Sequence, residues 1–194
     1  MHDAAEIKAL QQKLTEEDST EAFGQLYMAY MQHLLQFAKS IIRNHELAEE
    51  IVSDVFIRIW QNRKKVAAID NLKLYLYVST KNTALNYLSR HFRKQSLSLD
   101  EMTVNLSTAS YNPEELLITS EAVKRIEHEI RQLPPRCKLI FKLVKEDGLK
   151  YNDIAQLLDI SVKTIDSQMA IAVKKISSAI HFELKRTPRP SANH

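Results

Sequence analysis

The sequence predicts an all-α fold, with two small helical domains joined by a flexible linker and a helix-turn-helix in the C-terminal domain. The 194 residues include only two glycines and five prolines, whereas residues that favour helices are plentiful. Apolar residues recur at helical spacing in both halves of the chain. Between the halves, residues 95–115 are rich in Ser, Thr and Asn and contain no Lys or Arg, which is typical of a linker. We therefore predict domains at 1–94 and 116–186, with a disordered tail at 187–194.

Four helices are expected in the N-terminal domain. A short helix is predicted at Ala4–Leu14, followed by a longer amphipathic helix from about Glu21 to Ile42. Asn44 is placed to cap a third helix, which extends to Gln61. A fourth amphipathic helix is expected over residues 72–92.

The C-terminal domain is expected to hold four more helices. The first ends near Gln132, ahead of two prolines, and Pro135 suits the first turn of the second. Gly148 is predicted to end that second helix as a C-terminal cap. The stretch "YNDIAQLLD" is a short third helix, and Ser161 is a good N-cap for a fourth that extends to about Leu184.

The last two helices and their three-residue joint have the pattern of a helix-turn-helix. The predicted core stripe of the last helix consists of Val162, Ile165, Met169, Val173, Ile176 and Ile180. On or beside its outward face lie Ser161, Lys163, Thr164, Ser167, Gln168, Ile171 and Lys174. Most are short polar or basic residues at the amino end, the part of this motif that enters a major groove. The alternative is a packed antiparallel hairpin without a DNA role.

The net charge of +3 is too small to identify a partner, but the distribution of charge is informative. His45–Trp60 holds four acidic residues and one basic residue. The following stretch, Gln61–Lys94, holds eight basic residues and one acidic residue. Two adjacent surfaces of opposite charge predict two different partners.

The acidic and basic helices suit a protein and a nucleic acid respectively. On the acidic helix, the residues expected to face outward are Glu50, Ser53, Asp54 and Ile57. On the basic helix, amides and cations alternate with aromatic rings, a combination that can hold a strand and stack on exposed bases. In that helix, the residues expected in the core are Tyr75, Leu76, Leu85 and Leu88.

Composition and motifs argue against several function classes. The N-terminus has no secretory signal pattern, and no run of about 20 apolar residues could span a membrane. The single cysteine, Cys137, lies on an apolar helix without metal-ligand spacing around it, and a cytoplasmic location follows. No catalytic constellation or Gly-rich phosphate loop occurs. We expect no enzymatic activity, cofactor, metal or small-molecule substrate.

Three stretches resemble one known family. Leu133–Ile176 is similar to the C-terminal domain of bacterial sigma factors of the extracytoplasmic-function group, in the sigma-70 superfamily, although response regulators carry similar helices. The stretch "AEEIVSDVFIRIWQN" resembles the polymerase-binding helix of the same group. "NLKLYLYVSTKNTALNYLSRHFRK" resembles its downstream-promoter helix.

This resemblance implies a sigma factor that binds core RNA polymerase, reads the minus-35 and minus-10 promoter elements and assists DNA opening. Its implied polymerase contacts are Glu50, Ser53, Asp54 and Phe56. Its implied minus-10 contacts are Lys65, Asn71, Lys81, Asn82, Asn86 and Arg90, with the loop at about 65–71 capturing the non-template strand. Its implied minus-35 contacts are Ser161, Lys163, Thr164, Ser167, Gln168 and Lys174. The implied partners are core polymerase, promoter DNA and an anti-sigma factor. The rival functions are a stand-alone helix-turn-helix transcriptional regulator and a helical scaffold.

Overall fold

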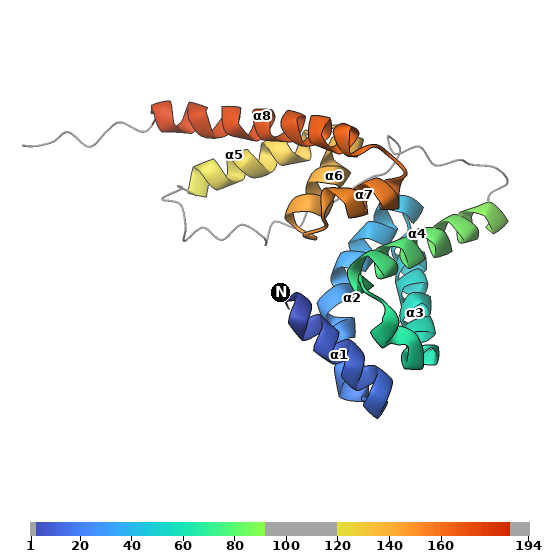
Figure 1. Cartoon of the computed structure of the whole chain (residues 1–194). Helices are drawn as coiled ribbons and strands as arrows, with labels where there is room; N and C mark the ends of the chain where they lie inside the picture. The colour runs from blue at the N-terminus through green and yellow to red at the C-terminus, as the bar shows by residue number, and fades with distance from the viewer. Residues whose placement is uncertain (1–2, 92–119, 187–194) are drawn as a thin grey trace, which may run out of the picture. The chain divides into compact units, whose positions relative to one another are not determined.

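The computed structural model describes residues 3–91 and 120–186, and in those ranges it is helical and contains no strands (Figure 1). The first of two units holds α1 (Ala4–Glu17), α2 (Thr20–Ile42), α3 (His45–Gln61), the 3-10 helix η1 (Arg63–Ala68) and α4 (Leu72–His91). The second holds α5 (Ser120–Arg131), α6 (Pro135–Lys145), α7 (Tyr151–Leu158) and α8 (Val162–Arg186). The predicted fold class, all-α with two helical regions, is confirmed. The predicted linker at 95–115 and tail at 187–194 lie outside the described residues.

Short polar side chains begin the helices of the first unit. Between α2 and α3, Arg43 adopts a left-handed conformation with φ 53°, and Asn44 then caps α3. The Asn44 side-chain oxygen accepts a hydrogen bond from the Leu47 N–H at 3.0 Å, which confirms the predicted cap. In the same way, Asn71 accepts from the Leu74 N–H at 3.0 Å at the start of α4.

α2 is the central helix of the first unit, because it packs against α1, α3 and α4 (Figure 1). Its Phe37 is buried against Tyr77 of α4, with ring centroids 5.1 Å apart. Toward α3, the Phe56 ring lies between Phe23 and Tyr27, with centroid distances of 6.2 and 4.7 Å. These aromatic contacts hold α3 and α4 against one central helix, so the acidic and basic helices belong to one packed unit.

Two predictions for this unit are wrong. Tyr75 and Leu85 were expected in the core of α4, but they are 45% and 37% exposed, whereas Leu76 and Leu88 are buried as predicted. One side of α4 packs against both α2 and α3, and Tyr75 and Leu85 lie largely outside the surface that these two helices cover. The predicted loop at 65–71 is also wrong in part, since most of it belongs to η1.

α8 is the long helix on which α5, α6 and α7 pack (Figure 1). As predicted, Pro135 is the first residue of α6, and Gly148 takes the left-handed conformation, with φ 63°, in the turn after it. The Leu149 N–H closes that turn by donating to the Leu143 carbonyl at 2.9 Å. Pro135 therefore sets the start of α6 as predicted, but the helix ends at Lys145 with Glu146 as its C-cap, and Gly148 lies in the turn that follows instead of capping the helix.

The core stripe of α8 differs from the predicted one. Ile165, Met169 and Ala172 are buried, but Val162 and Val173 are 38% and 52% exposed. Both valines follow an apolar spacing of three or four, yet they lie at the edge of the stripe, where α6 and α7 do not cover them. The small residue Ala172 is instead fully buried on the side of α8 that packs against the other helices of the unit. The Ile180 side chain lies outside the described residues.

The turn between α6 and α7 contains a buried ionic cluster. The Lys142 ammonium donates to Asp147 Oδ1 at 2.6 Å and lies 3.7 Å from Glu146 Oε2. All three residues are buried, with relative exposures of 2–6%. A buried carboxylate is costly unless a cation or hydrogen-bond donors offset its lost hydration, so Lys142 is placed to stabilise this turn.

Candidate protein and nucleic-acid interfaces

The outward side of α3 forms a mixed acidic and apolar surface, here called the α3 surface and consisting of Glu50, Ser53, Asp54 and Ile57. Glu50 and Ser53 are exposed, Asp54 is half-exposed, and Ile57 is 52% exposed. Phe56, the fourth predicted polymerase contact, is only 3% exposed and lies beneath this surface. The sequence had placed Ile57 on the outward side, yet the predicted contacts did not include it.

Asp54 is coupled to α4 through Arg58. One guanidinium nitrogen of Arg58 lies 4.0 Å from Asp54 Oδ2, and another donates to Thr83 Oγ1 of α4 at 2.9 Å. The ion pair is half-exposed, and such pairs contribute only about 0.3–0.5 kcal/mol within a helix. The contact thus orients the Asp54 carboxylate but leaves its charge accessible to a partner.

The exposed side of α4 combines amide, cationic and apolar groups. This α4 face consists of Tyr75, Asn82, Leu85, Asn86 and Arg90, all of which are exposed. Asn82, Asn86 and Arg90 follow one another at four-residue intervals, and Tyr75 lies about two turns before Asn82. An exposed ring beside amides and a cation is an arrangement that can stack on a base and bind its edge and backbone.

The other predicted minus-10 residues lie apart from the α4 face. Lys81 is half-buried on a neighbouring side of the helix. Lys65 is exposed on η1, just before α4. Asn71 is exposed, but its side-chain oxygen is engaged in capping α4. The structure therefore brings three of the six residues together and gives Asn71 a structural role.

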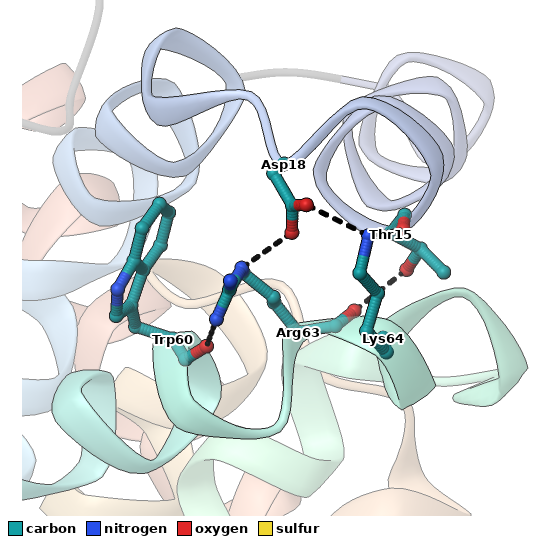
Figure 2. Close-up of polar contacts among 5 residues, drawn as sticks. All are labelled: Thr15, Asp18, Trp60, Arg63 and Lys64. Carbon is teal, nitrogen blue, oxygen red and sulfur yellow. Dashed lines mark hydrogen bonds and ion pairs between the residues drawn. The ribbon is translucent and has the colours of Figure 1, made fainter.

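Arg63 and Lys64, which belong to the basic stretch counted in the sequence, are paired with Asp18 within the fold (Figure 2). Arg63 Nε lies 2.5 Å from Asp18 Oδ1, and Lys64 Nζ lies 2.8 Å from Asp18 Oδ2. The Arg63 guanidinium also stacks over the Trp60 ring, 4.7 Å from its centroid. These contacts tie the end of α1 to η1 and reduce the positive charge available to a nucleic acid.

Asp18→Asn should make the chain less stable at neutral pH and little different from wild type in acid. Hydrogen bonds from Lys64 and then Arg63 hold the Asp18 pKa below its ordinary value of 3.8. A lowered carboxyl pKa stabilises the fold fully above the ordinary value, and this stabilisation is lost as the pH falls through the lowered value. Asparagine tolerates the left-handed conformation of Asp18, φ 52°, so the turn is retained.

Urea unfolding of both proteins at pH 7 and near pH 3 measures this effect. Because Asp18 is exposed, the difference at pH 7 should be small. A difference of the same size at both pH values would contradict an ionic origin. Glu17→Asn, one residue earlier on the exposed end of α1, is the control for loss of an acidic side chain.

The joint between α7 and α8 has the geometry of a tight helix-turn-helix. Asp159 ends α7 in the left-handed conformation, with φ 54°. Ser161 then caps α8, as predicted, by accepting from the Thr164 N–H at 3.0 Å. The two hydroxyl groups of Ser161 and Thr164 also share a hydrogen bond of 2.8 Å. These contacts fix the amino end of α8 at the surface.

An exposed stripe, here called the α8 face, consists of Lys163, Ser167, Ala170 and Lys174. The two lysines stand about 16 Å apart along the helix axis, with two small residues between them. Ser167 donates to the Lys163 carbonyl at 2.9 Å, so its oxygen remains as an acceptor. Ala170 was missed by sequence reasoning, although its spacing of three and four from its neighbours could have indicated it.

The other predicted minus-35 residues flank this face. Thr164 and Gln168 are half-buried beside it. The Gln168 carbonyl accepts from Cys137 Sγ at 3.2 Å, a contact that joins α8 to α6. Cys137 is fully buried, and burial raises its thiol pKa. Cys137 is therefore a packing residue that positions α8.

Neither a metal site nor a membrane span is found in the described ranges. No group of three or more His, Cys, Asp or Glu side chains within them is placed to hold a metal ion. Over residues 3–91 and 120–186, no helix is both long enough and apolar enough to cross a bilayer.

Comparison with known proteins matches each unit to a described family. Residues 26–94 match the family "Sigma-70 region 2", and residues 123–176 match "Sigma-70, region 4". The ECF RNA polymerase sigma-E factor of Haemophilus influenzae is 24% identical over 180 residues, which cover 89% of this chain and 94% of that protein. The sigma-E factor of Escherichia coli K12 is 24% identical over 173 residues, covering 86% and 90%.

The fold is also similar to that of a solved structure, CnrH in complex with the cytosolic domain of CnrY. The TM-score is 0.51 at 19% identity, over 92% of this chain and 98% of that chain. At this identity the likeness concerns the fold.

Proposed function

Because this chain belongs to the extracytoplasmic-function group of the sigma-70 family, we propose that it binds core RNA polymerase through α3 and reads promoter DNA with α4 and α8. A sigma factor is a transcription initiation factor and not an enzyme, so bond formation belongs to the polymerase. One observation carries the proposal most strongly: an acidic, apolar α3 surface and an aromatic, amide-bearing α4 face occur in one packed unit, joined by the Arg58–Thr83 hydrogen bond.

We assign the two domains different tasks. Residues 1–94 would bind the polymerase and act at the minus-10 element, and residues 116–186 would read the minus-35 element. Residues 95–115 would connect them. The division agrees with the separate family matches at 26–94 and 123–176.

The α3 surface suits a protein partner and not DNA. Glu50 and Asp54 would repel DNA phosphates but attract cations on a protein, while Ser53 offers a hydrogen bond. Exposed Ile57 adds apolar area among them. Phe56 would act indirectly, because its buried ring supports the helix from beneath.

The α4 face suits an opened strand of the minus-10 element. Asn82 and Asn86 offer amides that can hydrogen-bond to unpaired base edges. Tyr75 would stack on a flipped base, which offsets part of the few kcal/mol lost on unstacking. Around them, the phosphate contacts would come from Lys65, Lys81 and Arg90. Asn71 would contribute mainly by fixing the start of α4.

The α8 face suits a major groove of duplex DNA at the minus-35 element. Lys163 and Lys174 would bind phosphates at either end, where their charges attract DNA of any sequence. Ser167 and Gln168 would meet base edges between them. The capped amino terminus with Ser161 and Thr164 would approach the backbone, which helix N-termini favour. Ala170 leaves room for close approach of the groove.

A stand-alone regulator remains the rival function, because a helix-turn-helix also binds duplex DNA without polymerase. The α3 surface has no role in that function. We further propose an anti-sigma factor as a regulatory protein partner. A fold of this kind is seen in CnrH bound to the cytosolic domain of CnrY.

The test is reconstitution of the full-length chain with purified core RNA polymerase. We expect the two to co-elute and to initiate transcription at a defined set of genomic sites, mapped by sequencing RNA 5′ ends. Core polymerase alone is the control. DNA binding without co-elution or new start sites would instead indicate the stand-alone regulator.

A further inference from the structure

We propose that α1 fixes the backbone of residues 63–69 and thereby determines which bases the chain accepts at the minus-10 element. This inference rests on the proposed function, because the 63–69 segment leads directly into α4. The match to sigma-70 region 2 begins at residue 26, so α1 precedes it. Three α1 side chains, Gln11, Thr15 and Lys8, reach the backbone of this segment.

Gln11 is the central contact. Its side chain is almost fully buried, and its amide nitrogen donates to the Val66 carbonyl at 2.7 Å and the Ile69 carbonyl at 2.9 Å. The Val66 carbonyl also accepts the Ile69 N–H at 3.1 Å, the bond that closes η1, and the Ile69 carbonyl lies just past the end of this short helix. Gln11 therefore adds a second hydrogen bond to the Val66 carbonyl and gives the Ile69 carbonyl a donor, and it joins both to α1.

Thr15 and Lys8 add contacts on either side. The Thr15 hydroxyl donates to the Arg63 carbonyl at 2.8 Å (Figure 2). It also accepts from the Ala67 N–H at 2.9 Å, so it joins the two ends of η1. Lys8 Nζ donates to the Ala67 carbonyl at 2.8 Å. At the end of α1, Asp18 pairs with Arg63 and Lys64.

The segment itself, "RKKVAAI", offers little to define this conformation. It contains no Ser, Thr, Asn, Asp or Gly, the residue types that form local caps and turns. Val66 anchors it in the core, and two backbone hydrogen bonds close its turns, from the Lys65 N–H to the Asn62 carbonyl and from the Ile69 N–H to the Val66 carbonyl. The hydrogen bonds from α1 then hold this short helix in place. Its conformation is thus stabilised by a helix about 50 residues earlier in the chain.

The conformation of this backbone would affect base preference because it sets the positions of nearby exposed side chains. Lys65 and Ala68 are exposed on η1, and Asn71 and Tyr75 follow within two turns of α4. A shift of the segment would move these groups relative to a flipped base. Gln11, Thr15 and Lys8 are therefore positioning residues, which act without touching DNA.

Gln11→Leu is the main test, because leucine keeps the bulk of the side chain but removes both donated hydrogen bonds. Gln12→Leu is the matched control, since Gln12 is the exposed neighbour on the same helix. Holoenzymes of both variants are assayed on a promoter library randomised at the minus-10 element. We expect Gln11→Leu to keep core binding and minus-35 preference, to broaden the minus-10 base preference and to lower initiation about tenfold. Gln12→Leu should behave as wild type.

Hydrogen exchange of backbone amides 64–71 in the free chain tests, without polymerase, whether α1 holds this segment. We expect faster exchange there in Gln11→Leu and unchanged exchange in α5–α8. Lys8→Met, with exposed Lys13→Met as its control, gives a milder variant in case Gln11→Leu unfolds.

Unchanged hydrogen exchange in both Gln11→Leu and Lys8→Met, or an unchanged minus-10 base preference in their folded holoenzymes, would overturn the inference. If the wild-type chain itself fails to start transcription with core polymerase, the proposed function is wrong, and so is the proposed effect of α1 on minus-10 base preference. The exchange measurement would still decide whether α1 holds the segment, so the two failures are distinguishable.

Discussion

Asp54→Arg is expected to weaken binding of the chain to core RNA polymerase by at least about 30-fold, equivalent to about 2 kcal/mol. Asp54 is half-exposed at the centre of the α3 surface, between Glu50 and Ile57. The acidic α3 surface would face cations on the polymerase. Reversing the charge at position 54 would place an arginine opposite those cations, and like charges at an interface are strongly unfavourable. The new arginine would also lie beside Arg58, but repulsion at this spacing costs the helix only about 0.2–0.5 kcal/mol.

Competition for core polymerase against a labelled wild-type chain measures this affinity. Glu16→Arg makes the same charge change at an exposed position of α1 and should leave binding unaltered. Asp54→Asn should have a smaller effect, and Ile57→Asn should weaken binding without any change of charge. Equal loss in Asp54→Arg and Glu16→Arg would indicate a general charge effect and contradict a specific α3 surface.

Lys142→Met is expected to destabilise the C-terminal unit by about 3–5 kcal/mol. Methionine fits the space of the lysine stem but withdraws a positive charge from two buried carboxylates. The Lys142–Asp147 contact is 2.6 Å, so a strong charge-assisted hydrogen bond is lost as well. For a small domain with total stability of about 5–15 kcal/mol, such a loss approaches unfolding.

Chemical denaturation of the full-length chain, followed by hydrogen exchange of each unit, measures this loss. The control is Lys145→Met, an exposed lysine one turn further along α6, which should change stability by less than about 0.5 kcal/mol. We expect α6–α8 to lose protection while α1–α4 keep theirs. A Lys142→Met protein as stable as Lys145→Met would show that the cluster contributes no net stability.

Helix positions followed from local signals that need no tertiary contact. Asn44 and Ser161 cap helices by bonding to N–H groups three residues ahead, so the sequence alone could place both helix starts. The start of α6 followed likewise from Pro135, whereas the helix ends at Lys145, ahead of the predicted cap Gly148. The opposite charges of α3 and α4 were also visible along the chain.

The wrong core predictions share a physical cause. Apolar spacing defines a stripe on a helix, but the neighbouring helices decide how wide a stripe they cover. Val162 and Val173 lie at the edge of such a stripe and stay exposed, as do Tyr75 and Leu85 on α4. For Tyr75 the error concerned function, because the exposed ring is the group that a flipped base would need.

The sequence by itself determined the α-helices, their order, the helix-turn-helix and the separation of acidic and basic surfaces, because all of these depend on local periodicity, caps and composition. Only the tertiary structure decided which charges stay available and what holds the 63–69 segment. Asp18 lies about 45 residues from Arg63 and Lys64, and Gln11 lies 55 from Val66. No local pattern encodes such pairs, because they form only when α1 packs against η1.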